Sequence, residues 1–126
     1  MTTINGFDTD QHLIPAVIRR AKQLGLIAAG RYLKNLTADE VAACAAAKFK
    51  LWLIDEGMGN RATFQRGEAG GHIDGQKAAI RAKVLGVTAN TPIFFAIDYD
   101  ATVSDVANIR AYLNGCLLYT SDAADE

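Results

Sequence analysis

The feature that most constrains this chain is an alternation of short apolar runs and amphipathic segments that repeats four times. The apolar runs cover residues 3–8, 26–33, 49–56 and 92–100. After the first run, apolar residues recur at helical spacing at Ile14, Val17, Ile18, Ala21 and Leu24. Parallel strands that are covered by helices have continuous apolar sequences of this kind. The pattern therefore predicts an α/β fold with four consecutive βα units and excludes β-sandwiches and all-helical bundles.

Local start and stop signals mark the helices between these runs. Pro15 suits the first turn of the first helix, and Thr37 with Glu40 forms a capping box before the second. We expect residues 57–71, which contain five glycines, to form a long loop, followed by a helix over residues 73–85. Arg61, Phe64 and Arg66 are either a substrate lid or ordinary solvated residues in that loop.

Two architectures fit four βα units, an open doubly wound sheet and a (β/α)8 barrel. The first run is not followed by GxGxxG, and the chain contains no P-loop sequence. Three of the four runs instead end on carboxylates, which is where barrel enzymes carry catalytic groups. Because a complete barrel takes about 250 residues, we predict the N-terminal half of a barrel with strand order 1-2-3-4. Half a barrel leaves two strand edges unpaired, so we expect it to fold poorly alone.

Segment 116–126 differs in character from the rest of the chain. It reads Cys-Leu-Leu-Tyr-Thr-Ser-Asp-Ala-Ala-Asp-Glu, which matches codon by codon the translation of a transposon-end sequencing adaptor. The preceding helix closes on Asn114 and Gly115, a common C-cap signal. An ordinary acidic C-terminus is the alternative. We expect the native domain to occupy residues 1–115, and segment 116–126 to pack against nothing.

Composition limits the classes of partner. Lysine and arginine number 13 against 14 acidic residues, so the basic excess typical of nucleic-acid or membrane-surface binders is absent. No apolar run reaches the roughly 18 residues of a membrane span, and the first residues lack the pattern of a signal peptide. Cys44 and Cys116 provide neither a disulfide framework nor a zinc motif, and Cys44 is predicted to be a small buried residue. We expect no cofactor, no metal ligand and no localisation signal.

The carboxylates at the ends of the runs are the candidate catalytic groups. Side-chain alternation along strands brings Asp8, Glu56, Asp98 and, if the fourth strand extends far enough, Asp100 to one face, and points Asp55 to the other. Clustered carboxylates repel one another, which raises at least one pKa and keeps a proton available. Glycosidic cleavage requires one protonated acid and one ionised carboxylate. The alternative is that these acids are solvated or cap the following helices.

Other polar residues near the strand ends are candidate substrate contacts. Arg31 and Tyr32 end the second run, and Tyr99 lies between two of the acids. Arg31 is equally well explained as an ion-pair partner of the acids, and Tyr99 as a residue that packs outward. A third alternative uses Asp98 and Asp100 as ligands of a divalent metal in a barrel phosphodiesterase.

Several motifs together resemble a known family. They are Gly6-Phe7-Asp8, Tyr32-Leu33, Leu36-Thr37 with Glu40, Glu56-Gly57, Gly71-His72-Ile73-Asp74-Gly75, Leu85-Gly86 and the run from Ile93 to Asp100. Over most of residues 3–113 the chain resembles the glycoside hydrolase-like domain catalogued as domain of unknown function 1906. That family is a TIM barrel similar to the family-25 lysozymes, which cut the glycan of bacterial peptidoglycan, and it occurs in secreted bacterial proteins and phage lysins.

The resemblance implies a cell-wall glycan hydrolase that needs no cofactor. It places the acidic pair on Asp98 and Asp100, with Asp8 and Glu56 lining the same cleft. The family-25 lysozymes carry Asp-x-Glu on the fourth strand, whereas this chain has Asp-x-Asp. A non-catalytic, glycan-binding barrel is therefore the second function that we consider.

Overall fold

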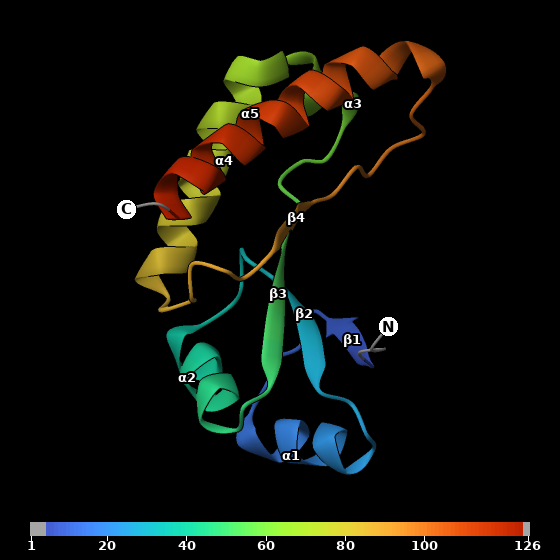
Figure 1. Ribbon diagram of the computed structural model, residues 1–126. Helices are drawn as coiled ribbons and strands as arrows, with labels where there is room; N and C mark the ends of the chain where they lie inside the picture. Colours follow the sequence, from blue (N-terminus) through green and yellow to red (C-terminus); the bar gives the residue numbers. More distant parts are fainter. Residues whose placement is uncertain (1–4, 125–126) are drawn as a thin grey trace.

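The computed structural model describes residues 5–124 of the chain, and their side chains as far as Leu117. Its four strands are β1 (Gly6–Thr9), β2 (Ala28–Tyr32), β3 (Lys50–Asp55) and β4 (Ile93–Phe95). They form one parallel sheet in the order β1-β2-β3-β4 (Figure 1). This confirms the α/β class and the predicted strand order and excludes the doubly wound order 3-2-1-4. The sheet is compatible with part of a barrel.

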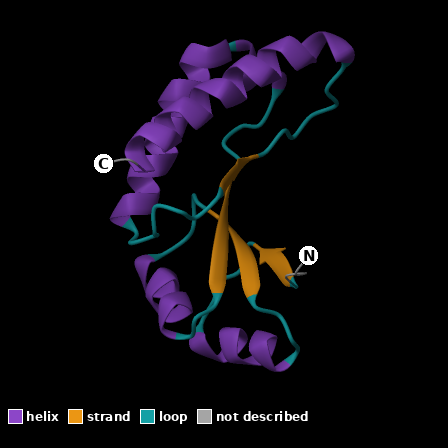
Figure 2. Ribbon diagram, in the orientation of Figure 1, coloured by secondary structure: helices purple, strands orange, loops and turns teal. Residues whose placement is uncertain are grey.

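Five α-helices connect and follow these strands (Figure 2). They are α1 (Pro15–Gln23), α2 (Ala38–Ala46), α3 (Arg61–Gln65), α4 (Gly67–Val84) and α5 (Val106–Ala124), the last preceded by a short 3-10 turn, η1 (Val103–Asp105). One face of the sheet packs on helices, and Ala29 and Leu53 on that face are completely buried. On the opposite face the Phe94 side chain is 58% exposed.

Helices α1 and α2 begin as the sequence predicts. Pro15 opens α1, and the Thr37 hydroxyl and the Glu40 carboxylate make the reciprocal bonds of a capping box at the start of α2. Ile18 and Cys44 are buried in the core that these helices share with β2, as expected for Cys44. The other predicted core residues of α1 do not all face this core. Ile14, Val17 and Leu24 are exposed because the described part of the chain places no element over them.

Helices α4 and α5 pack unusually closely along a seam of glycines. A Cβ atom at Gly71 would lie 1.8 Å from the Tyr112 carbonyl oxygen, and one at Gly115 would lie 2.1 Å from the Glu68 carbonyl oxygen. Side chains at these positions would force the two backbones apart. The helix continues through Gly115, so the predicted C-cap is wrong. Cys116 is buried against Gly75, so the expectation that segment 116–126 packs against nothing is wrong at its first residue.

Two further sequence predictions are corrected by the structure. Residues 57–71 are not a long loop, because α3 and the first turns of α4 occupy most of them. Phe64 in this segment is 1% exposed and packs on Tyr112, so it is a core residue and not part of a lid. Strand β4 ends at Phe95, well before Asp98 and Asp100, so the side-chain alternation does not extend to these acids. The remaining side chains of segment 116–126, from Leu118 onward, lie outside the described ones.

Candidate functional site

An open cleft of about 530 Å³ lies at the carboxyl-terminal edge of β1, β2 and β3. It is lined by Asp8, Thr9, Asp10, Tyr32, Lys34, Asn35 and Glu56. Parallel strands end at the same edge of a sheet, so the cleft brings together the side chains that end or follow three successive strands. Lys34 Nζ lies 3.4 Å from Glu56 Oε2, which places a cation among the acids of the cleft.

The sheet surface next to the cleft is built around Trp52 of β3. Its ring lies over Gly30 of β2 and reaches Gly6 of β1. A Cβ atom at Gly30 would lie 2.2 Å from the indole Nε1, and one at Gly6 would lie 3.0 Å from the ring. Because Gly6 has no side chain, the edge of the Trp52 ring can approach β1 two residues before Asp8.

A buried ion pair between Arg31 and Glu40 is connected to the residues that line the cleft, because Arg31 donates hydrogen bonds to Thr9 and Asn35. Arg31 is completely buried and Glu40 is 4% exposed, and Arg31 Nε donates to Glu40 Oε1 at 2.8 Å. Glu40 also accepts hydrogen bonds from the backbone N–H groups of Leu13 and Thr37, and His12 Nδ1 lies 3.0 Å from its Oε2. Burial opposes ionisation of Glu40, but the hydrogen bonds outweigh it and hold the pKa of this carboxyl well below its usual range.

This geometry shows how the candidate residues of β2 lie. Tyr32 lines the cleft with Asp8 and Glu56. Arg31 does not line it, because its guanidinium points to the helix-covered side and pairs with Glu40. Its ion pair is thus made with an acid of α2 and not with the acids at the strand ends.

Asp98 and Asp100 do not line this cleft. The Asp98 N–H donates to the Gly59 carbonyl oxygen at 2.8 Å, which holds the segment after β4 against the segment after β3. Arg61 Nη2 donates to the Asp100 carbonyl oxygen at 3.3 Å. Both acids are exposed.

Arg61 forms an ion pair with a second buried acid, Asp105. Its Nε donates to Asp105 Oδ1 at 2.9 Å, and its guanidinium lies 5.0 Å from the centre of the Tyr99 ring. The pKa of Asp105 is lowered to about 2, and the hydrogen bonds from Arg61 are the largest cause. Tyr99 also packs on Phe64, with ring centres 6.0 Å apart, so its ring is partly covered by the α3 segment.

A second hollow, of about 360 Å³, opens between the ends of β3 and β4 and helices α3, α4 and α5. Asp55 lines it and does not line the cleft of Asp8, consistent with its predicted opposite direction, whereas Glu56 lines both spaces. On α4, Asp74 accepts a hydrogen bond from the Tyr112 hydroxyl and is paired with Arg66. Burial first, and then the charge of Asp74, raises the pKa of Asp55.

The sequence predictions missed Asp74 and Tyr112 as members of a polar cluster. Arg66 and Asp74 are eight residues apart, which places them on one face of a helix. That signal was hidden because the glycines around them predicted a loop. Tyr112 has no local signal, since it meets Asp74 only through the contact between α4 and α5.

The part of the chain whose side chains are described contains no group of three or more His, Cys, Asp or Glu residues placed to hold a metal ion. It also contains no helix long and apolar enough to cross a membrane.

Comparison with known proteins decides the family. The model of the Rv2525c-like, glycoside hydrolase-like domain matches residues 18–118. The chain belongs to this family. The Rv2525c-like match includes the whole of β2, β3, β4, α2, α3 and α4 and parts of α1 and α5, and it runs past Gly115 to residue 118. The comparison with curated proteins gives no match.

A solved structure shares the fold of this Rv2525c-like domain. It is the crystal structure of the Tat-secreted protein Rv2525c of Mycobacterium tuberculosis in complex with HEPES. The two chains are 19% identical and align with a TM-score of 0.71. The alignment covers 90% of this chain and 62% of Rv2525c, so this chain spans less than two thirds of the length of that protein.

Proposed function

We propose that this domain binds bacterial cell-wall glycan in the cleft of Asp8, Tyr32 and Glu56, and that the complete domain hydrolyses it as a lysozyme-like glycosidase. The observation that carries the proposal is that Asp8 and Glu56, which end or follow different strands, line one polar cleft in a member of a glycoside hydrolase-like family. Paired carboxylates are the groups that most glycosidases use. The aromatic ring of Tyr32 supplies a surface on which a sugar ring packs.

The reaction assigns different work to the four acids. One protonated acid donates to the leaving glycosidic oxygen, and an ionised carboxylate stabilises or attacks the sugar carbon. By the resemblance, Asp100 is the acid and Asp98 the supporting carboxylate, with Asp8 and Glu56 holding the glycan. The hydrogen bond from the Asp98 N–H to the Gly59 carbonyl oxygen supports a shared site for Asp98 and Glu56, because Gly59 is three residues from Glu56 in the chain.

The second candidate is a barrel that binds glycan without cutting it. The observation that favours it is that Asp98 and Asp100 are exposed and do not line the cleft of Asp8. Asp100 also has a shorter side chain than the Glu of the family-25 lysozymes, which favours binding without cleavage. We propose further that cleavage depends on the rest of the barrel, since this chain spans 62% of the Rv2525c structure.

Two assays separate these functions. Co-sedimentation with purified peptidoglycan tests binding by this chain, and release of reducing sugars tests cleavage by a protein that carries the complete domain. A glycosidase binds and cuts, and Asp100→Asn lowers its cleavage by about two to four orders of magnitude without loss of binding. Binding without cleavage by the complete domain makes the protein a glycan-binding barrel. The absence of binding by either protein overturns both functions.

A further inference from the structure

The buried pair of Arg31 and Glu40 connects the two backbone segments that form the wall of the cleft. One segment starts at the last residue of β1, Thr9, and continues with Asp10; the other follows β2 and carries Asn35. We propose that Glu40 and Arg31 are positioning residues, which hold these two segments in the arrangement that the cleft requires. The use of the cleft for glycan rests on the proposed function, whereas the joining of the segments does not.

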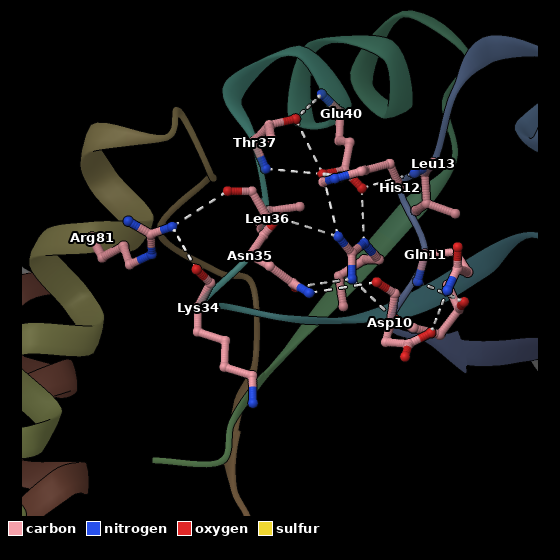
Figure 3. Close-up of polar contacts among 12 residues, drawn as sticks. Asp10, Gln11, His12, Leu13, Lys34, Asn35, Leu36, Thr37, Glu40 and Arg81 are labelled. Atoms are coloured by element: carbon pink, nitrogen blue, oxygen red, sulfur yellow. Dashed lines mark hydrogen bonds and ion pairs between the residues drawn. The ribbon is translucent and has the colours of Figure 1, made fainter.

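Glu40 takes hydrogen bonds from both segments at once. Its Oε1 accepts from the Leu13 N–H at 2.8 Å, after β1, and its Oε2 accepts from the Thr37 N–H at 2.9 Å, after β2. The Thr37 hydroxyl also donates to Oε2, at 3.1 Å. Figure 3 shows these bonds converging on the one carboxylate at the start of α2. A capping box alone needs only the bonds to Thr37, so the bonds to Leu13 and Arg31 are additional.

Arg31 carries the connection from Glu40 to the cleft lining. Its Nη1 donates to the Thr9 carbonyl oxygen at 3.0 Å and to Asn35 Oδ1 at 3.3 Å. Asn35 Nδ2 in turn donates to the Asp10 carbonyl oxygen at 3.4 Å, which closes a ring of bonds between the two segments. Arg31 and Glu40 do not line the cleft, so they act on it indirectly, through the backbone segments that they join.

The chemistry of the pair suits a fixed connection. The planar guanidinium presents five donors in a rigid fork, which spans acceptors on both segments at the same time. Arg31 is completely buried, and a buried charge that loses its partner is strongly destabilised. The two segments therefore move together as long as the pair is intact.

Two variants break the connection in different ways. Glu40→Gln keeps the size of the side chain but replaces one acceptor oxygen by an amide donor that faces other donors. Arg31→Lys keeps the positive charge but loses the fork that reaches Thr9 and Asn35. Should Glu40→Gln fail to fold, Arg31→Lys still decides the question.

Two further variants serve as controls on the same helix. Asp39→Asn removes a negative charge from the first turn of α2, where the Asp39 side chain is exposed. Cys44→Ala opens space in the core that α2 shares with α1 and destabilises the protein. Cys44 does not line the cleft and donates none of the hydrogen bonds that Glu40 accepts.

The experiment uses two readouts on the full chain. The first, without ligand, is the set of NMR cross-relaxation contacts between residues 9–13 and 33–37. The second is the dissociation constant of a soluble disaccharide–peptide fragment of peptidoglycan. We expect Glu40→Gln and Arg31→Lys to lose the contacts between the segments and to bind about tenfold more weakly, and both controls to match the wild type.

The possible results are distinguishable. Retention of the contacts between the segments in both test variants overturns the proposal. A loss of affinity in Cys44→Ala equal to that in Glu40→Gln also overturns it, because general destabilisation then explains the effect. If the wild type does not bind the fragment, the proposed function fails, and the contacts between the segments alone decide whether Glu40 and Arg31 position them.

Discussion

The Trp52 indole lies against Gly30 so closely that a Cβ atom there would be 2.2 Å from Nε1. The two residues are partners in the register between β2 and β3, and the ring continues across the sheet to Gly6. The absence of a side chain at Gly30 is therefore what allows a tryptophan to lie flat beside the cleft.

We predict that Gly30→Ala destabilises the protein by about 1–3 kcal/mol, the usual cost of overpacking, because the Trp52 ring has to leave its position. Urea unfolding measures this change, and the fluorescence of Trp52, the single tryptophan of the chain, reports the displacement of its ring. In a Trp52→Leu background the same substitution is expected to cost much less. An equal cost in both backgrounds would show that the clash with the ring is not the cause.

We predict that Glu40→Gln lowers the free energy of unfolding at pH 7 by about 3–5 kcal/mol, because it leaves Arg31 buried without its partner. The folded-state pKa of Glu40 lies below its ordinary value of 4.5, so the stability that its charge contributes is present above pH 4.5 and is lost as the pH falls toward the folded-state pKa. Urea unfolding from pH 7 down to pH 3 is expected to show the difference between wild type and Glu40→Gln shrinking. A difference that stays constant over this range contradicts the assignment, and Asp39→Asn serves as the control.

For Asp55 we predict the opposite effect of charge on stability. Burial and the nearby Asp74 raise its pKa, so its ionised form is disfavoured in the folded protein, and ionisation at neutral pH costs stability. Asp55→Asn removes that cost and retains an oxygen for the Gly57 N–H. The variant is expected to be more stable than the wild type at pH 7, with the gain fading as the pH falls and Asp55 becomes protonated. A loss of stability at pH 7 would indicate that the charge of Asp55 is required in the hollow.

The sequence was sufficient to predict the sheet and the residues that meet at its edge. Apolar runs ending near Asp8, Tyr32 and Glu56 predicted β1, β2 and β3, and strand order then brings these residues to one cleft. The fourth apolar run, residues 92–100, is longer than the strand that it contains, β4. The Ala96 N–H donates to the Asp55 carbonyl oxygen at the end of β3, and the chain then leaves the strand. The Asp98 N–H donates instead to the Gly59 carbonyl oxygen. The alternation of apolar and polar residues does not predict this change of partner.

The start of α4 could not be predicted because its glycines have a tertiary role. Glycine is a poor helix former, so a glycine-rich segment indicates a loop. Gly71 and Gly75 are nevertheless helical, since only glycine lets the backbone of α5 approach at Tyr112 and Cys116. The buried partners of Arg31 and of Asp74 depend in the same way on contacts between elements, which local sequence patterns do not specify.

The most direct test of the central claim is the position at which glycan binds. We propose to titrate the isotopically labelled chain with a soluble disaccharide–peptide fragment of peptidoglycan and to follow its backbone amide NMR signals. The account predicts that the largest changes occur at Asp8, Tyr32, Lys34 and Glu56, and that Asp8→Asn and Glu56→Gln weaken them. Changes confined to another surface, such as the groove lined by Pro15, Ile18 and Ala46 between α1 and α2, or no changes at all, would contradict it.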